Sequence, residues 1–167
     1  MDDLKKPFPG TNFSPWELIR SDTAIRLGID NIPPYWAMEN LVWLVEYILQ
    51  PIRDHFGPIR ILSGYRGLKL NEAVGGSEAS MHRYGQAADI EPISPVELIK
   101  IIDWAFNNTP FYELILEYPP DGWVHIGGSF RHRQIHGKGR LKLKTRDHNY
   151  TVFGNVEELK EALREAA

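Results

Sequence analysis

The first element that the hydrophobic pattern predicts is a helix, because apolar residues recur at helical spacing between residues 36 and 50. The recurring positions are Leu41, Leu44, Val45 and Ile48. Pro51 follows directly, and a proline inside a helix removes a backbone donor and crowds the preceding turn. The pattern therefore predicts a core-packed helix over 36–50 that ends before Pro51.

Three further helix starts follow from side chains that cap a first helical turn. In each, a Ser or Asn is followed three residues later by a Glu, so that the two side chains can satisfy backbone N–H groups that a helix leaves free. The segments are Ser14-Pro15-Trp16-Glu17, Ser94-Pro95-Val96-Glu97 and Asn155-Val156-Glu157-Glu158. We therefore predict helices that begin after Ser14, Ser94 and Asn155, with proline at the first helical position of the first two.

Short apolar runs bounded by turn residues predict strands between and after these helices. The runs span residues 59–62, 87–90, 112–118, 123–126, 141–145 and 150–153. The last two are expected to form a hairpin around 146–149. Helices come first and are then mixed with strands, without a repeat or a linker. We therefore predict a single α+β domain over 1–167, with a small, mostly antiparallel sheet flanked by helices.

The turn between two of these strands predicts which side chains meet across them. Pro119-Pro120-Asp121-Gly122 suits a type I turn followed by a left-handed glycine, which gives a three-residue loop with a bulge. In that register Glu117 faces His125 on one side of the sheet, about 5 Å away at Cβ. A simple four-residue loop would instead separate them. The other side would face the core, with Leu114, Leu116, Val124 and Ile126.

Composition excludes several classes of protein. The 167 residues include no cysteine, which removes zinc fingers, thiol enzymes and disulfide-stapled miniproteins. Its 19 Lys and Arg against 22 Asp and Glu give a net charge of −3, too small to indicate disorder. Residues 1–10 are unlike a secretory signal, and no run approaches the roughly 18 apolar residues of a membrane span. We therefore expect a soluble protein that is made in the cytoplasm without a signal peptide and does not insert into a membrane.

Metal chemistry in a chain without cysteine requires His, Asp or Glu ligands, and a catalytic zinc site needs three of them with one position open for water. The sequence places His82 at a turn and Asp89 on the strand that follows. Gly85, Ala87 and Ala88 lie between them, and their small side chains would let the backbone pass close to a metal ion. Such a pair also occurs by chance, so a surface His and a strand-end Asp are the alternative.

Five segments in a fixed order resemble one known family. They span residues 63–66, 71–77, 80–89, 114–117 and 123–126. Together they resemble the zinc D-alanyl-D-alanine carboxypeptidase family, which shares its fold with the hedgehog signalling domain, and the chain is most similar to the small, phage endolysin-like branch. The resemblance covers about residues 13–128. Residues 129–167 match only loosely, and there we expect a basic hairpin and a C-terminal helix.

The resemblance implies one zinc ion held by His82, Asp89 and His125, with water as the fourth ligand. It also implies hydrolysis of a peptide bond next to a D-residue in peptidoglycan stem peptides, by D-Ala-D-Ala carboxypeptidase or endopeptidase action. Lytic enzymes of the phage-type branch commonly reach the cell wall through a membrane pore made by another protein. We therefore expect this route for the chain, and we expect it to act as a monomer.

Two acidic residues compete for the role of general base. Some relatives carry an acid three residues before the last histidine, where this chain has Gly122. The phage-type branch instead ends the preceding strand with a glutamate, which here is Glu117, and the predicted hairpin register independently places it beside His125. Glu117 is therefore the expected base, and Asp121, better interpreted as a turn residue, is the alternative.

Four residues are candidates for binding substrate. Arg66 resembles the arginine that holds substrate in the family, and its planar guanidinium suits a carboxylate or a polarised carbonyl, which would give it a catalytic role. The alternative is a structural arginine that binds backbone carbonyls. Ser80 would donate a hydrogen bond to substrate or only fix the loop before His82. Tyr65 and Trp123 would flank the cleft, although aromatic residues at strand ends also serve in packing.

A basic stretch follows the motifs, since residues 131–146 contain seven Lys or Arg and no acid. Such a stretch could attract anionic cell-wall polymers or nucleic acid. The chain as a whole is acidic, so no nucleic-acid partner is expected. His132, His136 and His148 are expected to be exposed rather than ligands. The remaining alternative to a peptidase is a non-catalytic zinc-containing binding module of the same fold. The presence of Glu117 as an intact base favours the peptidase.

Overall fold

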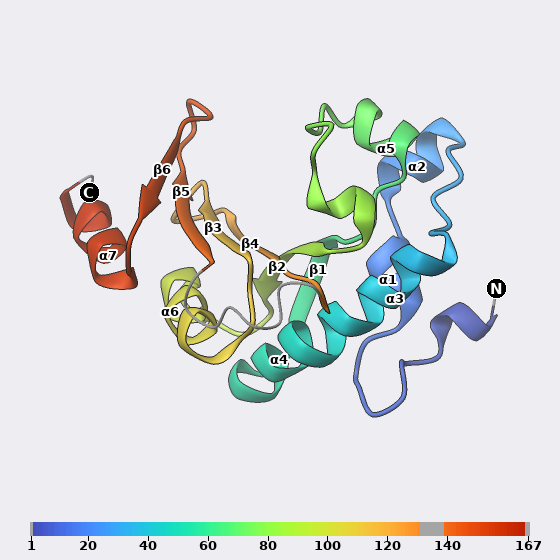
Figure 1. Ribbon diagram of the computed structural model, residues 1–167, viewed down its shortest axis with the longest axis horizontal. Helices are drawn as coiled ribbons and strands as arrows, with labels where there is room; N and C mark the ends of the chain where they lie inside the picture. The colour runs from blue at the N-terminus through green and yellow to red at the C-terminus, as the bar shows by residue number, and fades with distance from the viewer. Residues whose placement is uncertain (1, 131–138, 166–167) are drawn as a thin grey trace.

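The computed structural model describes residues 2–130 and 139–165, and its arrangement is shown in Figure 1. Within these residues the strands form one sheet in the order β1-β2-β4-β3-β5-β6. They are β1 (Ile59–Ser63), β2 (Ala87–Pro92), β3 (Glu113–Glu117), β4 (Trp123–Gly127), β5 (Arg140–Lys144) and β6 (Tyr150–Phe153). Neighbouring strands are antiparallel, except that β3 and β5 are parallel. The structure therefore confirms the α+β prediction and the mostly antiparallel sheet.

Helices supply the other layer of the core. They are α1 (Pro15–Ile19), α2 (Asp22–Leu27), α3 (Tyr35–Leu44), α4 (Gln50–Phe56), α5 (Leu68–Ala73), α6 (Leu98–Asn108) and α7 (Val156–Glu165), with the shorter turns η1 (Asp2–Lys5), η2 (Val45–Leu49) and η3 (Met81–Tyr84). Helix α6 packs against β3, β4 and α4. In Figure 1, α4 and α6 lie below the sheet, whereas the segment from α5 to β2 rises above it. None of the helices in the described residues is both long and apolar enough to cross a membrane.

The helix predicted over 36–50 does not end before Pro51. It runs from α3 through the π-helical turn η2 into α4 without a break. At the end of η2 the N–H of Gln50 donates to the carbonyl of Val45, five residues back. This wider turn moves the ring of Pro51 away from the carbonyl that it would otherwise crowd, so the chain stays helical through the proline.

Two of the three predicted helix starts are confirmed. At α1, the Ser14 hydroxyl accepts the N–H of Glu17 at 3.4 Å, and the Glu17 carboxylate accepts the N–H of Ser14 at 2.8 Å. At α7, the side chain of Asn155 accepts the N–H of Glu158 at 3.0 Å. Both caps also place an acidic side chain in the first turn, where the helix dipole favours negative charge.

The third predicted start, after Ser94, is wrong, because α6 begins only at Leu98. The Ser94 hydroxyl donates to the carbonyl of Phe56 at 3.4 Å instead of capping a helix. The N–H of Ile93 likewise donates to the carbonyl of Pro58 at 3.0 Å. These two contacts hold the segment after β2 against the connection between α4 and β1. The tertiary contacts therefore outweigh the local capping signal.

The β3–β4 hairpin differs from the predicted register. Glu117 pairs with Trp123, and Ile115 pairs with His125, so the loop has five residues rather than three. The residue after Glu117 leaves this pairing because its N–H donates to the carbonyl of Lys144 on β5. The predicted pairing of Glu117 with His125 is therefore wrong by two positions. Since side chains alternate between faces, a shift of two keeps both residues on the same face.

The core side of this hairpin was predicted correctly despite the shift. Its four residues, Leu114, Leu116, Val124 and Ile126, are at most 1% exposed. They pack with residues of α3, η2 and α6 in one hydrophobic cluster. The β5–β6 hairpin is also confirmed, with Leu143 opposite Thr151. The opposite face of the sheet is thus left for polar side chains.

Candidate metal centre

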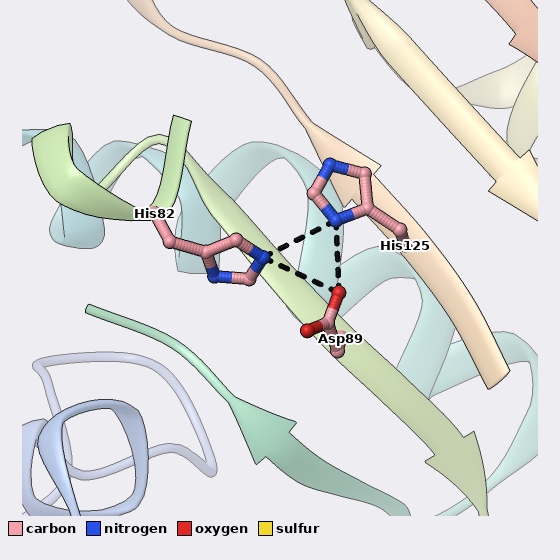
Figure 2. Close-up of side chains that lie close together, drawn as sticks. All are labelled: His82, Asp89 and His125. Carbon is pink, nitrogen blue, oxygen red and sulfur yellow. Dashed lines mark hydrogen bonds and ion pairs between the residues drawn. The ribbon is translucent and has the colours of Figure 1, made fainter. Parts of the chain in front are cut away.

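Three side chains from different elements meet on the face of the sheet opposite the core (Figure 2). His82 comes from η3, Asp89 from β2 and His125 from β4. Asp89 and His125 are direct partners in the β2–β4 ladder. His82 is 1% exposed and His125 7%, so both imidazoles are buried. The antiparallel ladder and the short turn before β2 therefore bring together residues that are far apart in the sequence.

The candidate ligand atoms form a tight triangle. Nδ1 of His125 lies 2.8 Å from Oδ1 of Asp89 and 3.2 Å from Nε2 of His82. Nε2 of His82 lies 3.3 Å from the same Asp89 oxygen. A zinc ion at its usual distances of about 2.0–2.1 Å, with tetrahedral angles, would separate its ligand atoms by about 3.3 Å. The three atoms are therefore spaced as a set that can share one ion.

The carbonyl of Gly64 fixes the tautomer of His82. Nδ1 of the ring donates to this carbonyl at 2.7 Å, which leaves the lone pair on Nε2, the atom that faces the triangle. Gly64 itself packs against α1, and a Cβ at this position would lie 2.2 Å from the carbonyl oxygen of Leu18. Glycine is therefore required where the end of β1 passes close enough to orient the imidazole.

His125 presents its other ring nitrogen to the triangle. With Nδ1 as the ligand atom, Nε2 carries the proton, and Nε2 is buried without a hydrogen-bond partner among the described residues. Oε1 of Glu113 lies 3.8 Å from it, which is beyond hydrogen-bond distance. The ring is therefore oriented by its neighbours in the triangle and by packing, whereas that of His82 is held by a backbone carbonyl.

Burial and mutual charge set the protonation states in the triangle. Burial lowers the pKa of His82 below its ordinary value, although the carboxylate of Asp89 opposes this shift. Burial alone would raise the pKa of Asp89, but the charges and hydrogen bonds of His82 and His125 hold it well below its ordinary value. The centre therefore favours a neutral imidazole at His82 and an anionic Asp89, which are the forms that bind a divalent cation.

The metal-free protein is expected to lose stability as the pH falls below about 6.5. The pKa of His82 is lower in the folded protein than in the unfolded chain, so as the pH falls the unfolded chain binds a proton at this side chain first. The stability that is present at higher pH is therefore lost progressively as the pH falls to the folded-state pKa. The lowered pKa of Asp89 adds a second loss below about pH 4. Urea unfolding of chelator-treated protein across this range measures both losses. A free energy of unfolding that stays constant from about pH 7 to 5 would contradict the first.

Arg66 reaches the same region from the loop after β1. Its backbone N–H donates to the carbonyl of His82 at 3.1 Å, which ties this loop to η3. Burial lowers the pKa of its guanidinium, and the charges of Asp89 and Glu117 partly offset this effect. Nε of Arg66 is buried without a hydrogen-bond partner among the described residues. The cation therefore lies close to both carboxylates of this face.

Glu117 lies at the end of β3 on the same face and is 6% exposed. Its carboxylate accepts a hydrogen bond from Nζ of Lys144 on β5 at 2.8 Å. Burial alone would lower the pKa of Lys144, but its hydrogen bonds with Glu117, Tyr118 and Tyr150 raise it. The lysine therefore stays charged and holds the carboxylate. Sequence reasoning missed this role, because no local signal predicts the parallel pairing of β3 with β5.

The other predicted substrate-binding residues have different surroundings. Tyr65 is 7% exposed and belongs to the hydrophobic core, and burial raises the pKa of its hydroxyl. Trp123 is half-buried, with its ring centroid 5.1 Å from that of Tyr118. Ser80 is half-buried directly before η3. Asp121 is exposed in the β3–β4 loop. Ser80 and Trp123 are thus more accessible to a substrate than Tyr65.

The basic stretch over 131–146 is described only from residue 139 onward, so His132 and His136 lie outside the described residues. His148 is exposed, as expected. The basic side chains of β5 have partners: Lys142 pairs with Glu113, Lys144 with Glu117, and Arg140 donates to the hydroxyl of Tyr112. In its described part, therefore, Lys142 and Lys144 neutralise the acids of β3, whereas Arg140 and Arg146 are exposed.

A buried His/Asp/His triangle that could hold a metal ion, with a carboxylate on the same face and a guanidinium close by, is an arrangement that suits metal-dependent hydrolysis. Consistent with this class, the sequence matches the Peptidase M15 family over residues 11–127, and the chain belongs to this family. It is therefore a peptidase. No curated protein matches the chain. The family match ends at the last residue of β4, so β5, β6 and α7 lie beyond it.

Proposed function

We propose that this peptidase uses zinc to hydrolyse the stem peptides of bacterial peptidoglycan. The observation that supports this best is the triangle of Nε2 of His82, Oδ1 of Asp89 and Nδ1 of His125. Two imidazoles and one carboxylate suit zinc and leave one position open for water or substrate. A bound zinc ion would polarise the scissile carbonyl and lower the pKa of water toward neutrality.

Glu117 is the proposed general base. Its carboxylate would take a proton from the attacking water and return it to the leaving amine. It is buried on the face of the sheet that carries His125, and Lys144 keeps it in place at 2.8 Å. Asp121 is the weaker candidate because it is exposed in the loop beyond β3.

Arg66 is the proposed substrate-holding residue. Its planar guanidinium can donate two parallel hydrogen bonds to a peptide carboxylate, or stabilise the oxyanion that forms at the scissile carbonyl. Nε of Arg66 has no hydrogen-bond partner in the described part of the chain, so no backbone carbonyl holds this atom, which disfavours a purely structural role. Ser80 and Trp123 would line the path of the substrate, and Tyr65 would support Arg66 from within the core.

The motif resemblance supports a narrower biological assignment. We propose that the scissile bond lies next to a D-residue and is cut by carboxypeptidase or endopeptidase action. We further propose a phage-type lytic enzyme, made in the cytoplasm and acting as a monomer on the cell wall after release through a pore formed by another protein. The segments over 63–126 are the basis for this assignment.

Mass spectrometry of purified peptidoglycan incubated with the protein tests the proposal. We expect new peptide ends that disappear when a chelator is present and return with added zinc, and their masses identify the bond that is cut. Intact stem peptides from several wall types, after incubation with folded and zinc-loaded protein, would contradict the proposal. That result would favour a non-catalytic zinc-containing binding module of the same fold.

A further inference from the structure

A concave site lies beside the elements of the candidate metal centre. It is a cavity of about 620 Å³, lined by side chains of α3, of η3 with the residue before β2, and of the chain beyond β4. Its wall shares η3 with His82, and its far side follows directly on the strand that carries His125. The cavity therefore adjoins the elements that carry two of the three candidate ligands.

Three exposed aromatic residues line the cavity from three different elements. Trp36 of α3 is 50% exposed, Tyr84 of η3 is 42% exposed, and Phe130 beyond β4 is 68% exposed. The rings of Trp36 and Tyr84 are tilted by 44° with their centroids 6.2 Å apart, so they do not bury each other by stacking. Exposed aromatic rings gathered around a cavity indicate a ligand-binding surface.

The backbone around the cavity is fixed rather than open to collapse. Nδ2 of Asn40 donates to the carbonyl of Tyr84 at 2.9 Å, which ties α3 to η3. Gly85 packs so closely on α3 that a Cβ there would lie 2.4 Å from the carbonyl oxygen of Ala37. The N–H of Gly128 donates to the carbonyl of Gln86 at 2.8 Å, which ties the end of β4 to the same turn. The cavity is therefore preformed.

The polar groups of the lining define the chemistry of the ligand. Asn40 and Gln86 supply carboxamides, and Glu39 is the only charged side chain that lines the cavity within the described residues. No cation is present among the described lining residues, so these residues do not neutralise an acidic peptide or a phosphate. Planar amides and one carboxylate can instead bind hydroxyl and amide groups, while aromatic faces pack on the C–H groups of a ring.

We propose that this cavity binds a neutral pyranose ring that carries hydroxyl and acetamido groups, as found in the glycan strand to which stem peptides are attached. The proposal rests on the proposed function, because a peptidase that acts on such peptides meets the glycan beside its metal centre. Trp36 is the main stacking platform, and Tyr84 and Phe130 flank it. Arg83 lies 5.9 Å from the ring centroid of Tyr84, so that ring is partly engaged already.

The first test is a titration that needs no turnover. The zinc-loaded protein is titrated by calorimetry with a tetramer of β-1,4-linked N-acetylglucosamine, which contains no stem peptide. We expect the tetramer to bind, and we expect Trp36→Ala to weaken binding at least tenfold. Tyr150→Ala is the matched control, because Tyr150 is also 50% exposed but lies on β6, away from the cavity lining. The affinity of this variant for the tetramer should stay within twofold of the wild type. Absence of binding, or equal affinity of Trp36→Ala, would overturn the proposal.

The second test separates this site from the metal centre. Cleavage of stem peptides still attached to glycan is compared with cleavage of the same peptides after removal of the sugar. We expect Trp36→Ala to lower kcat/KM at least fivefold on the attached peptides and to leave the free peptides unchanged. An equal loss on both substrates would assign the cavity to the peptide and overturn the proposal. If the wild type cleaves neither substrate, the proposed function fails, and the tetramer titration still decides whether the cavity binds sugar.

Discussion

Glu117→Gln is expected to lower kcat by about 10²- to 10⁴-fold, the range that a positioned general base contributes, while zinc stays bound. Gln keeps the size of the side chain and can still lie beside Lys144, but it cannot take a proton from water. Because Glu117 does not belong to the ligand triangle, the metal content should not change. Steady-state kinetics on the peptide identified by mass spectrometry, with metal analysis of the same sample, measures both effects.

Glu113→Gln is the matched control for this substitution. Glu113 lies on the same strand and face, and it also pairs with a lysine of β5, Lys142. Loss of an acid–lysine pair by itself would affect both variants alike, whereas loss of the base affects only Glu117→Gln. A Glu117→Gln variant that keeps full turnover with zinc bound would exclude Glu117 as the base. Asp121→Asn should then show the large loss.

Loss of a residue that only supports a metal ligand weakens metal binding by about 10- to 100-fold. Asp89→Asn is expected to weaken zinc binding by more than this. The substitution removes the negative charge and one of three ligands, and it leaves two imidazoles facing a neutral amide. Activity should fall to background and should not return with zinc at concentrations that saturate the wild type. Competition with a chromophoric chelator measures the affinity.

Asp54→Asn is the control for the change from Asp to Asn. Asp54 is exposed and accepts a hydrogen bond from Gln50 at 2.6 Å, and it lies on α4, which supplies no side chain to the triangle. It should leave zinc affinity unchanged. Circular dichroism of each variant shows whether the fold is retained, and His125→Ala provides a second ligand variant if Asp89→Asn does not fold. Wild-type zinc affinity in both ligand variants would show that the triangle does not hold the metal.

Local signals in the sequence predicted most of the elements. The capping box at Ser14, the side-chain cap at Asn155 and the strand runs succeeded because each depends on neighbours within a few residues. The predicted cap at Ser94 and the predicted helix end at Pro51 were wrong. In the first case contacts with another part of the chain outweighed the local signal, and in the second case an unusual turn did. Contacts with Phe56 and Pro58 hold the segment after β2, and a π turn accommodates the proline.

The meeting of His82, Asp89 and His125 as a candidate metal-binding group was predictable for a different reason. Without cysteine, only His, Asp and Glu remain as zinc ligands, and the motifs around His82, Asp89 and His125 occur in the order seen in a known family. The structure adds what no motif contains: three ligand atoms separated by 2.8 to 3.3 Å and a tautomer set by the carbonyl of Gly64.

The sequence by itself determined the types of ligand, the alternation that keeps Glu117 and His125 on one face, and the helices with complete local caps. Only the tertiary structure decided the loop of five residues, the pairing of Lys144 with Glu117, and the aromatic cavity around Trp36. Alternation and capping depend on residues adjacent in the chain, so they can be derived from the sequence pattern. Strand order and cavity walls depend on contacts between segments that are distant in the chain. Sequences with the same local pattern can differ in these contacts, so the local pattern does not determine them.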